Sequence, residues 1–102
     1  MAVEKITLAN FESFVSGDAP VLVDFYADWC GPCRMLAPVI EQLAGSEAGL
    51  KVGKVNVDEE GSLAERFGIS SIPFVALFRG GEVVATSLGF ATAEQLKKKL
   101  GL

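Results

Sequence analysis

Hydrophobic residues along the chain fall into two kinds of segment. Short, nearly continuous apolar runs rich in valine and phenylalanine are typical of strands that are buried on both faces of a sheet. Such runs predict strands at residues 3–7, 20–27, 51–57, 74–78 and 82–87. Between them, apolar residues recur every three or four positions, which is the spacing of a helix with one buried face. This second pattern predicts helices at residues 8–16, 32–45, 59–67 and 92–100.

The predicted strands and helices alternate, which favours an α/β fold. Strand–helix–strand connections are right-handed and give a mostly parallel sheet that helices cover on both faces. Only Arg79, Gly80 and Gly81 separate the last two strands, and paired glycines favour a tight hairpin, so this pair should be antiparallel. We therefore expect a three-layer α/β/α sandwich with a mixed central sheet of about five strands and four helices, and residues 1–102 as a single domain.

Individual residues add detail to this prediction. Pro38 lies inside the second predicted helix and should kink it, because its ring removes a backbone donor and crowds the preceding turn. Leu8 has the spacing of the apolar face of the first helix, and Thr92 and Gln95 have the spacing of a capping box at the start of the last. Five aromatic residues are assigned to the core: Phe11, Phe14, Phe25, Phe67 and Phe78.

The composition narrows the range of functions. Half of the 102 residues are hydrophobic, which excludes a disordered chain, and the net charge of -4 argues against a nucleic-acid partner. Because the chain has no histidine, it lacks the Cys/His and Ser/His/Asp catalytic pairs and most transition-metal sites. No secretion signal is visible at the start, and the longest apolar run, residues 72–78, is too short to cross a bilayer. We expect a soluble, cytoplasmic protein without a membrane partner.

The two cysteines lie in the segment Trp29-Cys30-Gly31-Pro32-Cys33, between a predicted buried strand and a predicted helix. This spacing brings their sulfurs within bonding distance across the first helical turn, and so small a ring opens and closes at modest entropic cost. Cys30 precedes the free N–H groups of the helix, and these groups and the helix dipole favour a thiolate there. Cys33 should be less exposed. This asymmetry suits thiol–disulfide exchange in which Cys30 attacks and Cys33 resolves.

Other interpretations of these residues stay open from the sequence. A zinc site needs four ligands, so two thiols without an imidazole would have to share the metal with another chain. The cysteine pair could also be inert and simply buried in the core. Asp24 interrupts an apolar strand, where it is either a partly solvated residue or a buried acid able to take a proton from Cys33.

Together these features resemble the thioredoxin family over essentially the whole chain. The chain shares the Trp-Cys-Gly-Pro-Cys motif, an aspartate in the preceding strand, a proline in the motif helix, Ile-Pro before the fourth strand and a glycine after the fifth. The resemblance implies a protein-disulfide reductase in which Cys30, Cys33 and Asp24 are catalytic, without bound cofactor or metal. It also implies a monomer that acts on disulfide-containing proteins and is recycled by a thioredoxin reductase, a flavoprotein that draws on NADPH.

The resemblance also assigns roles to residues around the pair. The positions that match the apolar docking surface of the family are Trp29, Gly31, Pro32, Ile72, Pro73, Leu88 and Gly89. In the family the peptide bond before the matching proline is cis and faces the cysteines, whereas a trans bond is the default for an X-Pro sequence. Lys54 matches a lysine that lies near the family's aspartate, although the residue by itself reads equally well as an ordinary surface lysine.

The chain departs from the usual family pattern at three positions. Tyr26 stands where tryptophan is common, Phe74 where threonine is usual, and Phe90 where many members have a small residue. The last two bear on substrate range. An oxidase or isomerase of the same fold is a rival function, but those proteins usually carry a histidine between the cysteines, where this chain has Gly31 and Pro32. A rival from another class is a redox-independent binding subunit of a larger assembly.

Overall fold

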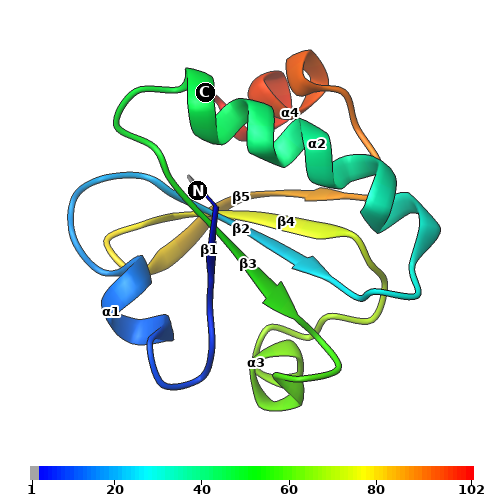
Figure 1. Ribbon diagram of the computed structural model, residues 1–102. Helices are drawn as coiled ribbons and strands as arrows, with labels where there is room; N and C mark the ends of the chain where they lie inside the picture. The colour runs from blue at the N-terminus through cyan, green and yellow to red at the C-terminus, as the bar shows by residue number, and fades with distance from the viewer. Residues whose placement is uncertain (1–2) are drawn as a thin grey trace.

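The computed structural model of the chain describes residues 3–102 (Figure 1). In that range strands and helices alternate as the sequence predicts, with two strands in succession before the last helix. The strands are β1 (Val3–Lys5), β2 (Val21–Tyr26), β3 (Lys51–Asn56), β4 (Phe74–Arg79) and β5 (Glu82–Leu88). The helices are α1 (Phe11–Val15), α2 (Gly31–Ser46), α3 (Gly61–Arg66) and α4 (Ala93–Leu100).

The strands form one mixed sheet in the order β1-β3-β2-β4-β5. Strands β1, β3 and β2 are parallel, whereas β4 is antiparallel to β2 and β5 is antiparallel to β4. Two of the four strand pairs are therefore antiparallel, whereas only the hairpin pair was expected to be. The chain leaves β3, passes through α3 and enters β4 from the same end of the sheet, so β4 runs against β2 and β3.

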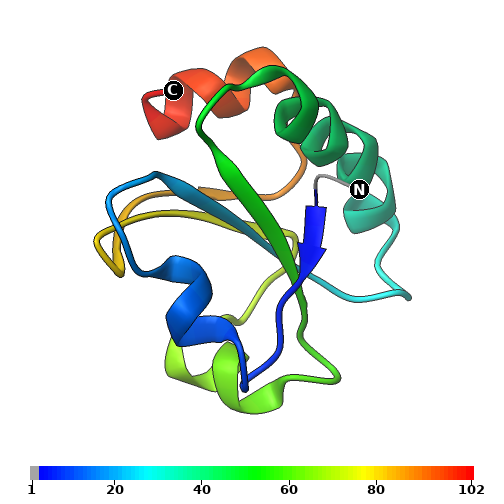
Figure 2. The same cartoon turned by 60° about the vertical axis from the view of Figure 1, so that its left-hand side comes forward.

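Helices α2 and α4 cover one face of the sheet (Figures 1 and 2). The buried positions of α2 are spaced as one helical face, and they pack on alternate residues of the central strands. This cluster consists of Leu22, Leu36, Ile40, Leu43, Val52, Val75, Leu77, Ala91, Leu96 and Leu100. Burial of each such aliphatic side chain contributes about 1.5–3 kcal/mol, so the packing fixes α2, and the cysteine motif at its start, against the sheet.

Helices α1 and α3 cover the opposite face (Figure 2). Aromatic rings dominate this second cluster, and Phe11, Phe67 and Phe78 meet with ring centroids 5.4 to 5.7 Å apart. Of the five phenylalanines assigned to the core, Phe11, Phe14, Phe25 and Phe78 are buried, and Phe67 is partly buried and packed against them. The three-layer α/β/α sandwich is thereby confirmed.

Most predicted helix boundaries agree with the structure to within two residues, and α1 is the exception. The predicted helix begins at residue 8, but α1 begins at Phe11, because the Asn10 side chain accepts a hydrogen bond from the Thr7 amide at 2.8 Å and closes a turn before the helix. Leu8 consequently lies 58% exposed and does not join the core. Helix α2 continues without a break through Pro38, and the predicted capping box of Thr92 opens α4.

Candidate active site

The cysteine pair lies where β2 leads into α2. Cys30 is the N-cap residue of the helix and Cys33 lies in its first turn, so that their Cα atoms are 5.2 Å apart and their sulfurs form a disulfide. The Cys33 amide donates a hydrogen bond to Cys30 Sγ at 3.2 Å. The two residues are about equally buried, at 4% and 3% exposed, so the expected difference in exposure is not observed. What distinguishes them is the amide donor, which would also favour a thiolate at Cys30 in the reduced form.

Asp24 is a buried acid in the middle of β2. The residue is 4% exposed, and its Oδ1 has no hydrogen-bond partner among residues 3–102, so the partly solvated alternative is wrong. Desolvation raises the pKa of the Asp24 carboxyl from 3.8 to about 7, against the opposing effect of the Lys54 charge. Alternate residues of β2 share a face, so Asp24 lies between Leu22, which packs beneath α2, and Tyr26, which lines a pocket together with Cys33.

Lys54 lies opposite Asp24 in the register of β3 with β2. Its ammonium group is 5.7 Å from the centre of the Tyr26 ring, and it lowers the pKa of Asp24 without making a close ion pair with that residue in the described part of the chain. The side chain is half-buried. Lys54 is therefore close enough to Asp24 to act on it through its charge.

The segment before β4 faces the cysteine pair. The Ile72–Pro73 peptide bond is cis, in agreement with the resemblance and against the default from sequence. The Ile72 carbonyl oxygen lies 3.9 Å from Cys30 Sγ, and the Gly89 amide donates to the Pro73 carbonyl at 2.8 Å. The loop after β5 is thereby held beside the segment before β4, whose Ile72 lies next to the disulfide.

Three large apolar side chains, two in loops and one at the end of β5, are exposed. They are Trp29 at 68%, Leu88 at 57% and Phe90 at 43%. Trp29 is next to Cys30 in the chain, and Leu88 pairs with Phe74, which follows the cis Ile72–Pro73 bond. Phe90 adds an aromatic side chain to the exposed apolar group.

Phe74, by contrast, belongs to the core. Its ring packs edge-on against Phe25, with centroids 6.2 Å apart, and the side chain is partly buried in the cluster beneath α1 and α3. This departure from the family pattern therefore lies on the face of the sheet away from α2. We therefore expect a substitution of Phe74 to change the stability of the protein before it changes substrate binding.

Sequence reasoning missed two residues that contact the motif loop. The Trp29 indole donates to the Asp58 carboxylate at 2.8 Å. Asp58 is held in turn by the buried Asn56, whose side-chain oxygen accepts from the Asp58 amide at 2.9 Å. A signal was present, because parallel β2 and β3 end at the same edge of the sheet, so the residues that follow them are neighbours.

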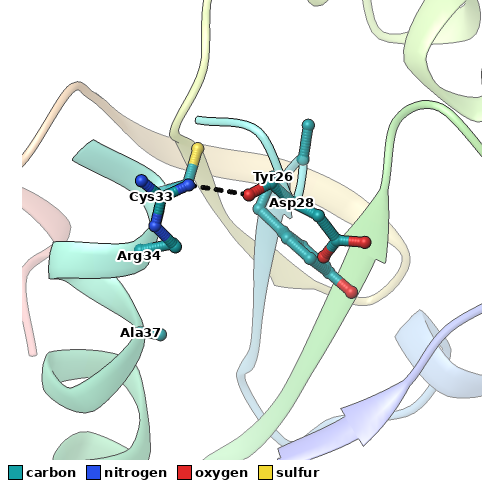
Figure 3. A pocket seen from close by; sticks show the side chains of 6 residues that line it. Tyr26, Asp28, Cys33, Arg34 and Ala37 are labelled. Carbon is teal, nitrogen blue, oxygen red and sulfur yellow. Dashed lines mark hydrogen bonds between the residues drawn. The ribbon is translucent and has the colours of Figure 1, made fainter. Parts of the chain in front are cut away.

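Arg34 is the second missed residue, and it lies at a pocket of about 330 Å³ beside Cys33 (Figure 3). The pocket is lined by Tyr26, Ala27, Asp28, Cys33, Arg34 and Ala37. The Arg34 guanidinium donates to the Asp28 carbonyl at 2.8 Å, which is the hydrogen bond drawn in Figure 3. The sequence gives no signal for this contact, because it depends on the rotamer of one long side chain.

Within residues 3–102 no group of three or more histidine, cysteine, aspartate or glutamate side chains is arranged to hold a metal ion. Across the same residues no helix is long and apolar enough to span a membrane.

Comparisons with known proteins agree on one family. The thioredoxin family model matches residues 2–101. A thioredoxin of Alicyclobacillus acidocaldarius is 49% identical over 100 residues, which cover 97% of this chain and 95% of that protein. A thioredoxin of Porphyra purpurea is 42% identical over 98% of this chain and 95% of its own length. A thioredoxin of Haemophilus influenzae is 48% identical over 86% of this chain and 84% of its own length.

Proposed function

The chain belongs to the thioredoxin family and is a protein-disulfide reductase that works through Cys30 and Cys33, and from this premise we propose the roles of its residues. The observation that carries the proposal is the disulfide at the start of α2, set beside exposed apolar side chains. The redox-independent binding role is not favoured, because it gives no reason for a cysteine pair at bonding distance in this position.

Cys30 is the attacking residue in this proposal. In the reduced protein its thiolate attacks one sulfur of a substrate disulfide, whose S–S bond breaks as the Cys30–substrate bond forms. The departing substrate thiolate takes a proton from solvent. The amide of Cys33, which donates to Cys30 Sγ, supports this assignment because it stabilises negative charge on that sulfur.

Cys33 then resolves the mixed disulfide, with Asp24 as the proton acceptor. The Cys33 thiol loses its proton, attacks Cys30 Sγ and expels the second substrate sulfur as a thiolate. The substrate has gained two electrons and the Cys30–Cys33 disulfide has formed. Burial of Asp24 supports its role, since a pKa of about 7 matches the carboxyl group to proton transfer near neutral pH.

The docking surface comprises Trp29, Gly31, Pro32, Ile72, Pro73, Leu88 and Gly89. An extended substrate segment lies across it, beside the Ile72 backbone and Cys30. Lys54 tunes Asp24 through its charge. The exposure of Trp29 and Leu88, and the proximity of Ile72 to Cys30, support this arrangement.

The remaining parts of the proposal concern the cellular setting. A thioredoxin reductase, a flavoprotein that draws on NADPH, returns the disulfide to the dithiol form, and this chain itself binds no cofactor. Residues 1–102 act as one thioredoxin domain, as a monomer in the cytoplasm. The family supports these assignments.

The proposal is tested by reduction of insulin disulfides with dithiothreitol as the terminal reductant. Wild-type protein should accelerate reduction, and the Cys30→Ser/Cys33→Ser variant should not. The double variant is a matched control, because it changes only the two sulfurs and leaves the exposed apolar side chains in place; its circular dichroism spectrum checks that it is folded. Acceleration by the double variant would show that the cysteine pair is not the reactive group.

A further inference from the structure

Cys30 is buried, but the two residues before it, Asp28 and Trp29, are exposed and have little packing to hold them. Trp29, at the centre of the loop of residues 28–30, is 68% exposed. Beneath the loop, a pocket of about 330 Å³ separates the end of β2 from the first turns of α2, and small side chains such as Ala27 and Ala37 line it. Since close packing is what usually fixes a segment of backbone, residues 28 and 29 need another restraint if they are to hold the backbone that leads into Cys30.

Arg34 reaches across this pocket from α2 to the loop (Figure 3). Its Nη1 donates to the Asp28 carbonyl at 2.8 Å, and a Cβ atom at position 31 would lie 3.9 Å from its Nη2, so the guanidinium lies along the loop. The Arg34 amide also donates to the Cys30 carbonyl at 3.1 Å. That second bond is the ordinary backbone bond of the first helical turn, so what the Arg34 side chain adds is the bond to Asp28.

The side chain of Arg34 has no competing partner in the described part of the chain. Every ion pair found in residues 3–102 involves another cation, so Arg34 is bound to the loop backbone and not to a carboxylate. On the other side of the loop, Trp29 is held by Asp58. The loop is thus restrained from both sides by hydrogen bonds.

We propose that Arg34 is a positioning residue that fixes the loop of residues 28–30 and so holds Cys30 Sγ in its attacking geometry against the Cys33 amide. The proposal rests on the disulfide-reductase function and adds a residue to it. A loop without this restraint populates other conformations, in which Cys30 Sγ no longer accepts from Cys33. The attacking thiolate is then both misplaced and less favoured.

The test compares Arg34→Met with Arg79→Met. Methionine keeps an unbranched apolar stem in the helix and removes the guanidinium. Arg79 is an exposed arginine at the end of β4, so its substitution removes the same charge away from the loop. Hydrogen exchange of the Cys30 amide, which donates to the Ala27 carbonyl, reports loop opening without any need for activity.

The kinetic measurement is attack of the reduced protein on 2-hydroxyethyl disulfide, a small neutral substrate, followed by the fluorescence of Trp29. Loss of one charge-assisted hydrogen bond should speed Cys30 amide exchange and slow attack, each about 3- to 10-fold, in Arg34→Met only. The midpoint of the rate–pH profile should rise, because the thiolate loses its fixed donor. These effects should persist at about 0.5 M NaCl, where a long-range charge effect is screened.

Several results would overturn the proposal. In one, Arg34→Met and Arg79→Met behave alike. In another, the effect disappears at high salt, which assigns it to charge alone. Faster exchange with an unchanged attack rate would also contradict the proposal, because the loop would be loosened without consequence for Cys30. None of these results bears on insulin reduction by the wild-type protein, which tests the reductase function separately.

Discussion

Substitution of Asp24 by asparagine should make the protein more stable at alkaline pH and slower to release substrate. In the folded protein Asp24 is buried and its pKa is raised from 3.8 to about 7. The folded state therefore holds the Asp24 proton more tightly than the unfolded state. As pH rises from about 4, the unfolded chain ionises first, and the wild-type protein loses stability until the pH exceeds about 7, where the loss levels off.

The size of the effect follows from the interval between the two pKa values. One pKa unit corresponds to about 1.4 kcal/mol, so the interval from 3.8 to about 7 corresponds to about 4 kcal/mol at the plateau. Asparagine cannot ionise, and its own cost, about 1–3 kcal/mol for a buried amide without full hydrogen bonding, is the same at every pH. The stability of Asp24→Asn relative to wild type should thus increase by about 4 kcal/mol between pH 4 and pH 8.5.

Urea denaturation of both oxidised proteins at four pH values between 4 and 8.5 measures this difference. Asp18→Asn is the matched control, since Asp18 is exposed and its substitution removes the same charge. The reasoning is refuted if the free energy of unfolding of Asp24→Asn and that of wild type stay parallel across this range. Single-turnover reduction should show normal formation of the mixed disulfide by Asp24→Asn and delayed release, because Cys33 has lost its proton acceptor.

Two further predictions concern the core. Gly53→Ala should lower the free energy of unfolding by about 1–3 kcal/mol, because a Cβ there would lie 2.7 Å from Ile6 Cγ1 and 2.9 Å from Phe14 Cε2. The rate of disulfide reduction should not change, and equal urea midpoints for the variant and wild type would contradict the prediction. Phe74→Thr should lower the free energy of unfolding by about 1–2 kcal/mol, because the contact of the ring with Phe25 is lost. The ratio of reduction rates on two protein substrates should stay the same, and a changed ratio at unchanged stability would place Phe74 in substrate binding.

The sequence predicts the features that local chemistry determines. The cysteine spacing, the break between β2 and α2, and the capping box of Thr92 each depend on residues within one turn of each other. The apolar residues on both sides of Asp24 made a buried acid one of two open interpretations, and the structure decides between them. The first three predictions needed no knowledge of how distant segments meet.

The features that the sequence does not predict depend on distant contacts or on single rotamers. The direction of β4 depends on which end of the sheet the chain re-enters after α3, and residues close together in sequence do not determine that. Leu8 has helical spacing but is excluded from the core by the turn that Asn10 closes. The contacts of Asp58 and Arg34 with the motif loop join groups whose meeting requires the folded sheet and helix.

Covalent trapping of substrates tests the central claim most directly, because it separates the attacking cysteine from the resolving one. Cys33→Ser should retain attack through Cys30 but lose resolution, so dithiothreitol-sensitive adducts with a disulfide-containing protein should accumulate. Cys30→Ser, which differs only in which sulfur is removed, should form few adducts. Equal trapping by both variants, or trapping by Cys30→Ser alone, would contradict the assignment of Cys30 as the attacking residue and Cys33 as the resolving residue.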